Sequence, residues 1–356
     1  MTDPRISQLA DILVDYSTEI HKNDYVQLLT SSPEGIPLFR ECYRRIIQRG
    51  AYLFPHIGFP GQDEIFFKYA SDEQLKHFPD LLMEETKRAT AYIRIGAPTN
   101  TRELSAIKPD RMTERSKVMK PILDERVDNT RWVATMFPTN AAAQDAGMSL
   151  EDYEDFFYSA TIRDWVIESK IMHEKKKIFD AGKIVRIKSS DTDLELSLDG
   201  RLGVASDGKK NMPDGELYFA PLETYTKGFI KFTYPSRYGG RDVEGIRLEF
   251  RDGKVVKATA EKNEDMLTKV VETDADARLI GEFAIGMNWG VQKFTHNLLF
   301  DEKIGGTIHI AIGRAYKECG GKSESAIHWD IVKDMRQDGE IFVDGKLVQK
   351  NGKWLV

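Results

Sequence analysis

The residues of this chain that are best suited to chemistry lie within one stretch, residues 281–330. Carboxylates, two histidines and a tyrosine occur there among apolar residues that favour β-strands, namely Glu282, Asp301, Glu302, His309, Tyr316, His328 and Asp330. Carboxylate oxygens and imidazole nitrogens are the usual ligands of zinc and of related divalent metals. The stretch therefore indicates a metal site built on strands, and we interpret the chain as a metalloenzyme.

Two segments of this stretch have the pattern of strands. In AIHWDIV, apolar and polar positions alternate, so that His328 and Asp330 share one face and Trp329 lies on the other. In GTIHIAIG, three isoleucines line one face and His309 lies on the other among small residues. A histidine on a face of small residues leaves room beside it for a ligand or an ion.

These patterns also have a structural interpretation. A histidine on an apolar strand is more often a hydrogen-bonded core residue than a metal ligand. Burying several carboxylates close together costs several kcal/mol each unless cations compensate them. Glu282, Glu302 and Asp330 therefore either reach the surface separately or converge on metal, and their spacing alone does not choose between these arrangements.

Several segments resemble those of a known family. LIGEFAIG, LLFDEKIGGTIHIAIGRAY and IHWD are similar to segments of the metallo-aminopeptidase family that includes thermophilic aminopeptidase T and staphylococcal aminopeptidase S. Upstream, NMPDGELYFAP resembles the Pro-x-Gly-Glu turn of that family, and TDLELSLDGR and TMFPTNAAAQDAGMSLEDYEDF resemble further segments. The resemblance covers most of the chain.

The resemblance implies a metal-dependent aminopeptidase that hydrolyses the N-terminal residue from short peptides, and it implies a homodimer. It implies a centre of two divalent ions (zinc, cobalt, manganese or magnesium) that activate a water. The residues carried over by position are Glu216, Glu282, His309, Tyr316, His328 and Asp330, with Glu302 as a further candidate ligand. Glu282 is the expected bridging carboxylate. Tyr316 is expected to approach a metal or to donate a hydrogen bond to the oxyanion that forms on the substrate.

The chain departs from the family pattern in two places. The stretch between Glu302 and His309 is slightly longer, and the stretch between Tyr316 and His328 is shorter. Glu216 follows an Asp-Gly turn, where a glutamate is ordinarily solvated, and only the resemblance favours it as a ligand.

An alternative function belongs to a different reaction class. His309, His328 and Asp330 also match the two-histidine, one-carboxylate ligand set of non-haem iron oxygenases. Ring-cleaving dioxygenases that act on dihydroxypyridines share the aminopeptidase-like fold and a similar chain length. Glu216 and Glu282 favour two metals over one iron. A third possibility, a non-catalytic relative that uses the site for binding, is disfavoured by the complete ligand set.

The elements that must position these residues divide the chain into two predicted domains. Residues 1–182 alternate between strands and helices, which is typical of a doubly wound α/β domain with a mainly parallel sheet. Residues 183–356 consist of short strands and glycine turns, and the tetrapeptide RDGK predicts a hairpin there. We therefore expect an α/β domain that shapes substrate access and a β-rich α+β domain that binds the metals.

Composition and the N-terminus exclude several classes of protein. The net charge is −6, from 51 basic and 57 acidic residues, and no basic block occurs, which argues against nucleic acid and anionic membranes as partners. No signal peptide and no apolar run of about 18 residues is present, so no membrane span is expected. The two cysteines, Cys42 and Cys319, lie far apart in sequence, which suits a reducing cytoplasm. Both are expected to fill space in the core as small apolar residues.

Overall fold

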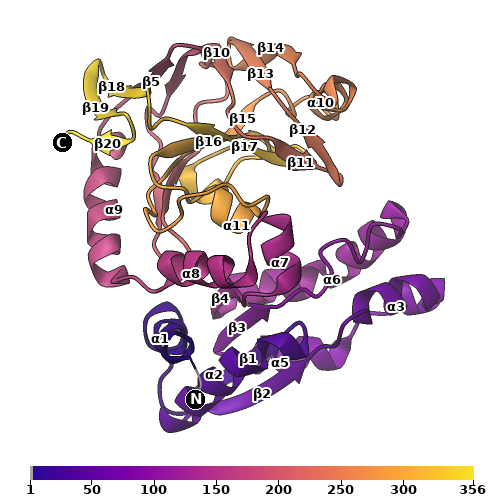
Figure 1. Cartoon of the computed structure of the whole chain (residues 1–356). Coiled ribbons are helices and arrows are strands. Elements are labelled where there is room, and N and C mark those ends of the chain that lie inside the picture. The colour runs from indigo at the N-terminus through magenta and orange to yellow at the C-terminus, as the bar shows by residue number, and fades with distance from the viewer. Residues whose placement is uncertain (1–2) are drawn as a thin grey trace. The chain divides into compact units, whose positions relative to one another are not determined.

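The computed structural model describes residues 3–356, which form two compact units (Figure 1). The first unit contains the chain up to Arg163 and residues 208–213, and the second contains residues 164–207 and 214–356. The expected domain boundary at residue 182 follows helix α9 (Trp165–Asp180), whereas α9 belongs to the second unit. It does so because the ring of Phe179 packs on Phe219 and Phe283, with centroids 5.2 and 6.3 Å away.

The first unit is built on a five-stranded parallel sheet in the order β2-β1-β3-β4-β8. Its strands are β1 (Tyr25–Thr30), β2 (Tyr52–Ile57), β3 (Ala91–Gly96), β4 (Arg131–Met136) and β8 (Asn211–Met212). The helices of this unit are α1 (Pro4–Asp11), continued by a π-helical turn (Ile12–Ser17), α2 (Ile36–Gln48), α3 (Gln62–Tyr69), α4 (Asp72–Lys76), α5 (Asp80–Arg88), α6 (Pro109–Asn129), α7 (Asn140–Asp145) and α8 (Leu150–Thr161). Strands that alternate with helices in this way confirm the predicted α/β class.

Local sequence explains where these helices begin and end. Helices α4 and α5 are separate, because the residue before Pro79 is disfavoured in a helix. Helix α8 begins after the N-cap residue Ser149, whose hydroxyl accepts a hydrogen bond from the Asp152 backbone N–H at 3.1 Å. None of the helices within residues 3–356 combines the length and the apolar character needed to cross a membrane.

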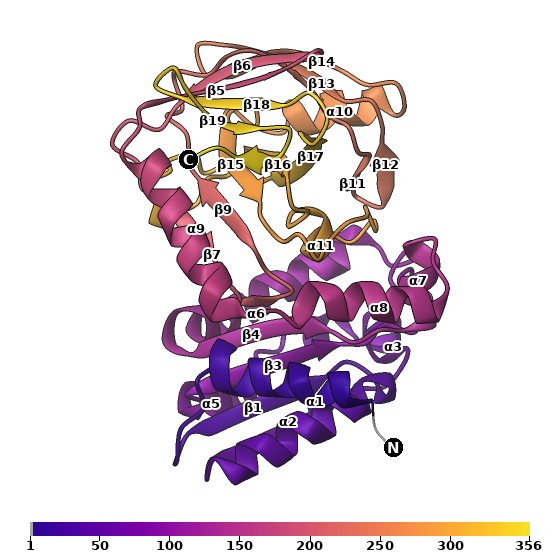
Figure 2. The ribbon, with the colours of Figure 1, turned by 60° about the vertical axis from the view of Figure 1, so that its left-hand side comes forward.

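The second unit contains two antiparallel sheets and a two-stranded ribbon (Figure 2). The larger sheet has the order β14-β13-β10-β6-β5-β18-β19-β20, with strands β5 (Ile184–Ser189), β6 (Thr192–Ser197), β10 (Lys227–Lys231), β13 (Arg247–Arg251), β14 (Lys254–Thr259), β18 (Glu340–Val343), β19 (Lys346–Lys350) and β20 (Lys353–Trp354). The hairpin predicted from RDGK joins β13 to β14, and Asp252 and Gly253 adopt the positive φ angles of 50° and 84° that its tight turn requires.

The smaller sheet has the order β17-β16-β15-β9-β7. Its strands are β7 (Val204–Ser206), β9 (Glu216–Phe219), β15 (Ile280–Gly286), β16 (Thr307–Gly313) and β17 (His328–Asp334); the ribbon is β11 (Ser236–Tyr238) with β12 (Arg241–Val243), and the remaining helices are α10 (Glu264–Val271) and α11 (Leu298–Asp301). Phe219 and Phe283 project from one face of this sheet and pack on Phe179, which also contacts Trp354 edge-on. The opposite face is therefore free to carry polar side chains.

Candidate metal centre

One face of the smaller sheet carries ionisable side chains next to small ones. The strand register places Glu282 of β15 opposite Ala311 of β16, and Ala311 opposite Asp330 of β17. Two residues along each strand, on the same face, His309 lies opposite Ala284. Residues that face each other across strands have their Cβ atoms about 5 Å apart, and alanine carries only a methyl group. The longer side chains can therefore reach over the alanines toward one another.

At the rim of this face, glycines leave room for longer side chains in the same way as the alanines. Glu216 begins β9 opposite Gly286, and His328 begins β17 opposite Gly313. The alternation predicted for the two histidine-bearing segments is confirmed, because both form strands in the register described. Four strands thus bring together residues that are far apart in sequence.

Glu282 lies at the centre of the cluster. Its Oε1 is 3.4 Å from His309 Nε2, and its Oε2 is 3.2 Å from His328 Nε2. His309 Nε2 is also 3.6 Å from Glu216 Oε2, and His328 Nε2 is 3.4 Å from Asp330 Oδ2. One carboxylate therefore faces both imidazoles, with a second carboxylate beyond each of them.

The ligand atoms form three overlapping groups, each with its atoms within 4.8 Å of one another. The groups are Glu216, Glu282 and His309; Glu282, His328 and Asp330; and Glu302, His309 and Asp330. Six of the seven residues expected at the site thus converge in one cluster. Two of the groups share Glu282, which is the carboxylate expected to bridge two metal ions.

Unpaired oxygens show that these residues fit a cation. Glu216 Oε2 and Asp330 Oδ1 are buried and have no hydrogen-bond donor among residues 3–356. Buried polar atoms nearly always have a partner, because leaving one unsatisfied costs free energy. Oxygen and nitrogen donors at this spacing suit divalent metals, which would satisfy these oxygens.

A backbone contact fixes which nitrogen of His328 faces the cluster. Nδ1 lies 2.7 Å from the Arg314 carbonyl oxygen, and since a carbonyl only accepts, Nδ1 is the nitrogen that carries the proton and donates. In neutral His328 the lone pair is then on Nε2, which faces Glu282 and Asp330. A histidine that is held through its other nitrogen in this way is typical of metal sites.

The carboxylates control the protonation of both histidines. Burial alone would lower their pKa values, but the adjacent carboxylates raise the pKa of His309 to about 9 and that of His328 to about 11. Burial alone would raise the pKa of Glu282, but the two imidazoles hold it at about 2. The cluster is therefore a set of ion pairs at neutral pH, and a metal that binds here must displace the protons.

Lys303 is a further member of the cluster, outside the residues expected from the sequence. Its Nζ donates to Glu216 Oε1 and to Glu302 Oε2, each at 2.8 Å, and the residue is only 1% exposed. Burial alone would lower the pKa of Lys303, but the two carboxylates raise it well above its usual value. No local pattern marks it, because lysines are mostly exposed and one of its two carboxylate partners, Glu216, lies 87 positions away in the sequence.

Glu302 and Tyr316 occupy different positions in the cluster. Glu302 lies within reach of His309 and Asp330 despite the longer stretch that separates it from His309, and burial raises its pKa to about 8. Tyr316 packs its ring edge-on against His328, with centroids 5.2 Å apart, and at a tilt against Tyr218, at 5.0 Å. Burial and the carboxylates raise the pKa of Tyr316, so its hydroxyl keeps its proton at neutral pH.

The segment between Tyr316 and His328 is held by carboxylates from outside the cluster. Glu223 accepts a hydrogen bond from the Lys322 backbone N–H at 2.8 Å, and Asp274 accepts one from the Ala326 N–H at 2.8 Å. These bonds anchor this segment to other parts of the second unit.

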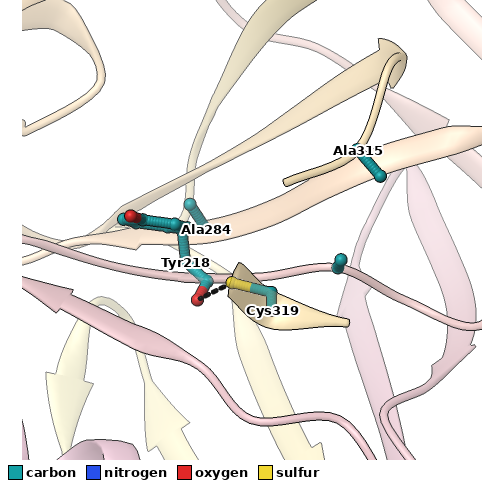
Figure 3. Packing of buried hydrophobic residues seen from close by; sticks show 5 residues of the cluster. Tyr218, Ala284, Ala315 and Cys319 are labelled. Carbon is teal, nitrogen blue, oxygen red and sulfur yellow. Dashed lines mark hydrogen bonds between the residues drawn. The ribbon is translucent and has the colours of Figure 1, made fainter. Parts of the chain in front are cut away.

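A patch of small residues adjoins the cluster on the same sheet face. Tyr218 packs there with Ala220, Ala284, Ala315 and Cys319, whose thiol donates to the Tyr218 carbonyl at a sulfur–oxygen distance of 3.7 Å (Figure 3). Burial raises the pKa of the Cys319 thiol to about 12, so it is not a thiolate at neutral pH. Both cysteines are buried, as expected for apolar filler.

Comparison with known proteins identifies the family. Residues 2–354 match the family described as thermophilic metalloprotease, M29. The chain is 27% identical to aminopeptidase T of Thermus thermophilus and 26% identical to aminopeptidase 2 of Geobacillus stearothermophilus. Each match covers 99% of this chain and 98% of the relative.

Solved structures agree with this result. Wild-type AmpT from Thermus thermophilus superimposes with a TM-score of 0.85 at 25% identity, over 99% of both chains. The 2,5-dihydroxypyridine dioxygenase of Pseudomonas putida has a TM-score of 0.61 at 13% identity, over 99% of this chain and 97% of that one, a likeness of fold alone. The resemblance and the fold class expected from the sequence are confirmed. The chain belongs to the thermophilic metalloprotease family, M29.

Proposed function

We propose that this chain is a metal-dependent aminopeptidase that removes the N-terminal residue from short peptides. The observation that carries the proposal is Glu282, whose two carboxylate oxygens face two different imidazoles, in a chain of a metalloprotease family. The relatives named above are themselves called aminopeptidases, which supports the same activity.

Two divalent ions would be held by overlapping groups of residues. Glu216, Glu282 and His309 would hold one ion, and Glu282, His328 and Asp330 the other, with Glu282 as the bridge. Glu302 would either be a further metal ligand or hold Lys303 in place through their hydrogen bond. Zinc, cobalt, manganese or magnesium would suit such mixed donors, and when bound the ions would supply Lewis acidity and a water of lowered pKa.

The chain's own residues would bind and orient the peptide. Tyr316, whose ring rests on His328, would donate a hydrogen bond from its hydroxyl to the oxyanion that develops on the substrate.

A homodimer and a cytoplasmic location remain predictions from the sequence.

The iron dioxygenase alternative has weaker support. It would use His309, His328 and Asp330 alone and assigns no role to the buried carboxylates of Glu216 and Glu282. The likeness to the dioxygenase is one of fold at 13% identity.

Metal content and peptide hydrolysis, measured together, test the proposal. The chain is purified without chelator, its metals are quantified per chain, and it is assayed on amino-acid p-nitroanilides after loading with cobalt or zinc. We expect about two divalent ions and release of the chromophore. One iron per chain without hydrolysis would replace this proposal with the dioxygenase. Light scattering of the same sample tests the homodimer, which a monomer would contradict.

A further inference from the structure

We propose that the Lys303 ammonium remains in the metal centre when metal binds, and that it makes the two metal positions differ in their affinity for a divalent ion. The position at Glu216 would bind a divalent ion more weakly than the position at Asp330. This inference rests on the two-ion centre proposed above and assigns a role to a residue outside the expected ligand set.

The Lys303 ammonium is held in place from several directions. Its Nζ contacts Glu216 and Glu302 at 2.8 Å each. Its backbone N–H donates to the Phe300 carbonyl at 3.0 Å, and its carbonyl accepts from the Asn288 N–H at 3.0 Å. The side chain is 2% exposed, so the ammonium has almost no access to water. Lys303 therefore stays beside Glu216 when an ion binds.

The two outer carboxylates differ in their surroundings. Glu216 shares one oxygen with the Lys303 ammonium and has only Oε2 left for an ion. Asp330 pairs with His328 alone, and no lysine or arginine among residues 3–356 forms an ion pair with it. An ammonium that is bound to a ligand carboxylate neutralises part of its charge and repels a divalent ion nearby. Repulsion by Lys303 therefore weakens metal binding at the Glu216 position more than at the Asp330 position.

The buried setting makes this difference large. In water the repulsion between an ammonium and a metal ion is strongly reduced, but in a buried cluster it is screened much less. Glu302 compensates the ammonium only in part, because Lys303 is shared between Glu302 and Glu216. We therefore expect affinities at the two positions to differ by more than about tenfold.

Calorimetric titration of the full, metal-stripped chain with zinc or cobalt tests the inference without any peptide. The wild type is expected to show two binding steps that differ by more than about tenfold, and Lys303→Met is expected to tighten the weaker step by about tenfold or more. Lys333→Met is the matched control, because Lys333 is a buried lysine of β17 that pairs with Asp191 instead, at 2.7 Å. It should leave both steps unchanged.

A second variant guards against misfolding. Lys303→Met leaves two buried carboxylates without their cation, so circular dichroism is recorded first. If the variant is unfolded, the titration uses Lys303→Gln, whose side-chain amide donates hydrogen bonds but carries no charge. Equal affinities in the wild type, or a weaker step that does not tighten in the folded variant, would overturn the inference. A stoichiometry of one ion per chain in every variant would refute the two-ion centre itself. Absence of peptide hydrolysis would leave the binding result intact.

Discussion

Replacing the central carboxylate by its amide, Glu282→Gln, perturbs the proposed centre most directly. The amide has nearly the same shape, so the packing of β15 is kept, but the negative charge that faces His309 at 3.4 Å and His328 at 3.2 Å is lost. Both proposed ions would lose a charged ligand at once. No other residue belongs to both of their ligand groups.

The expected magnitude follows from these contacts. Changing a residue that only supports a metal ligand already lowers metal affinity by roughly 10–100-fold. Because Glu282 would contact both ions directly, we expect its amide to lower affinity by at least about tenfold at each position, or about 100-fold for the pair. Each tenfold loss is about 1.4 kcal/mol of binding free energy.

Metal content after dialysis against a defined metal buffer measures this loss. Glu318→Gln is the control, because Glu318 is an exposed carboxylate that accepts a hydrogen bond from the Tyr218 hydroxyl at 3.3 Å and lies outside the three ligand groups. The control should keep both ions. If Glu282→Gln also kept about two ions per chain, with unchanged affinity, Glu282 would not be the bridge and the two-ion arrangement would be wrong.

Three further predictions concern the same unit. Tyr316→Phe should lower kcat by about 100-fold, the effect of removing one hydrogen-bond donor to an oxyanion, while metal content stays the same; unchanged turnover would remove Tyr316 from the chemistry. Phe283→Ala should lower the free energy of unfolding by about 3–5 kcal/mol, because the ring is fully buried against Phe219; a thermal melt that matches the wild type would contradict this packing. Burial alone would raise the pKa of Asp334, but its hydrogen bonds with Arg336 lower it, so this carboxylate stabilises the fold at neutral pH and the contribution is lost as the pH falls through the lowered pKa. Arg336→Gln should therefore lower the free energy of unfolding, measured with urea, by about 2 kcal/mol at pH 7 and by progressively less below pH 3.8. A loss of stability that does not change with pH would refute the ion-pair explanation.

Much of this protein can be predicted from local sequence alone. The alternation around His309 and around His328 and Asp330 determines that these side chains lie on one face of their strands, since successive residues of a strand point to opposite sides. The same local signals predicted the α/β class of the first unit and the β13–β14 hairpin. Each of these features depends only on neighbouring residues.

The convergence of the cluster was decided by tertiary structure. Glu216 approaches His309 because β9 pairs with β15 and β15 with β16, and neither pairing can be read from the spacing of the residues. For this reason the sequence alone left open whether the carboxylates reached the surface separately. Helix α9 joins the second unit for a similar reason, since Phe179 finds its partners on strands that follow later in the chain.

Lys303 shows the difference most clearly. In the sequence it is an ordinary charged residue after Asp301 and Glu302, and lysines are mostly exposed. Only the fold buries it and places Glu216, 87 positions away in the sequence, within 2.8 Å of its ammonium. Sequence determined which residue types were available and which faces they occupy. The pairing of distant strands decided which charges share a buried space, because the free energy of a buried charge depends on neighbours that the linear order does not specify.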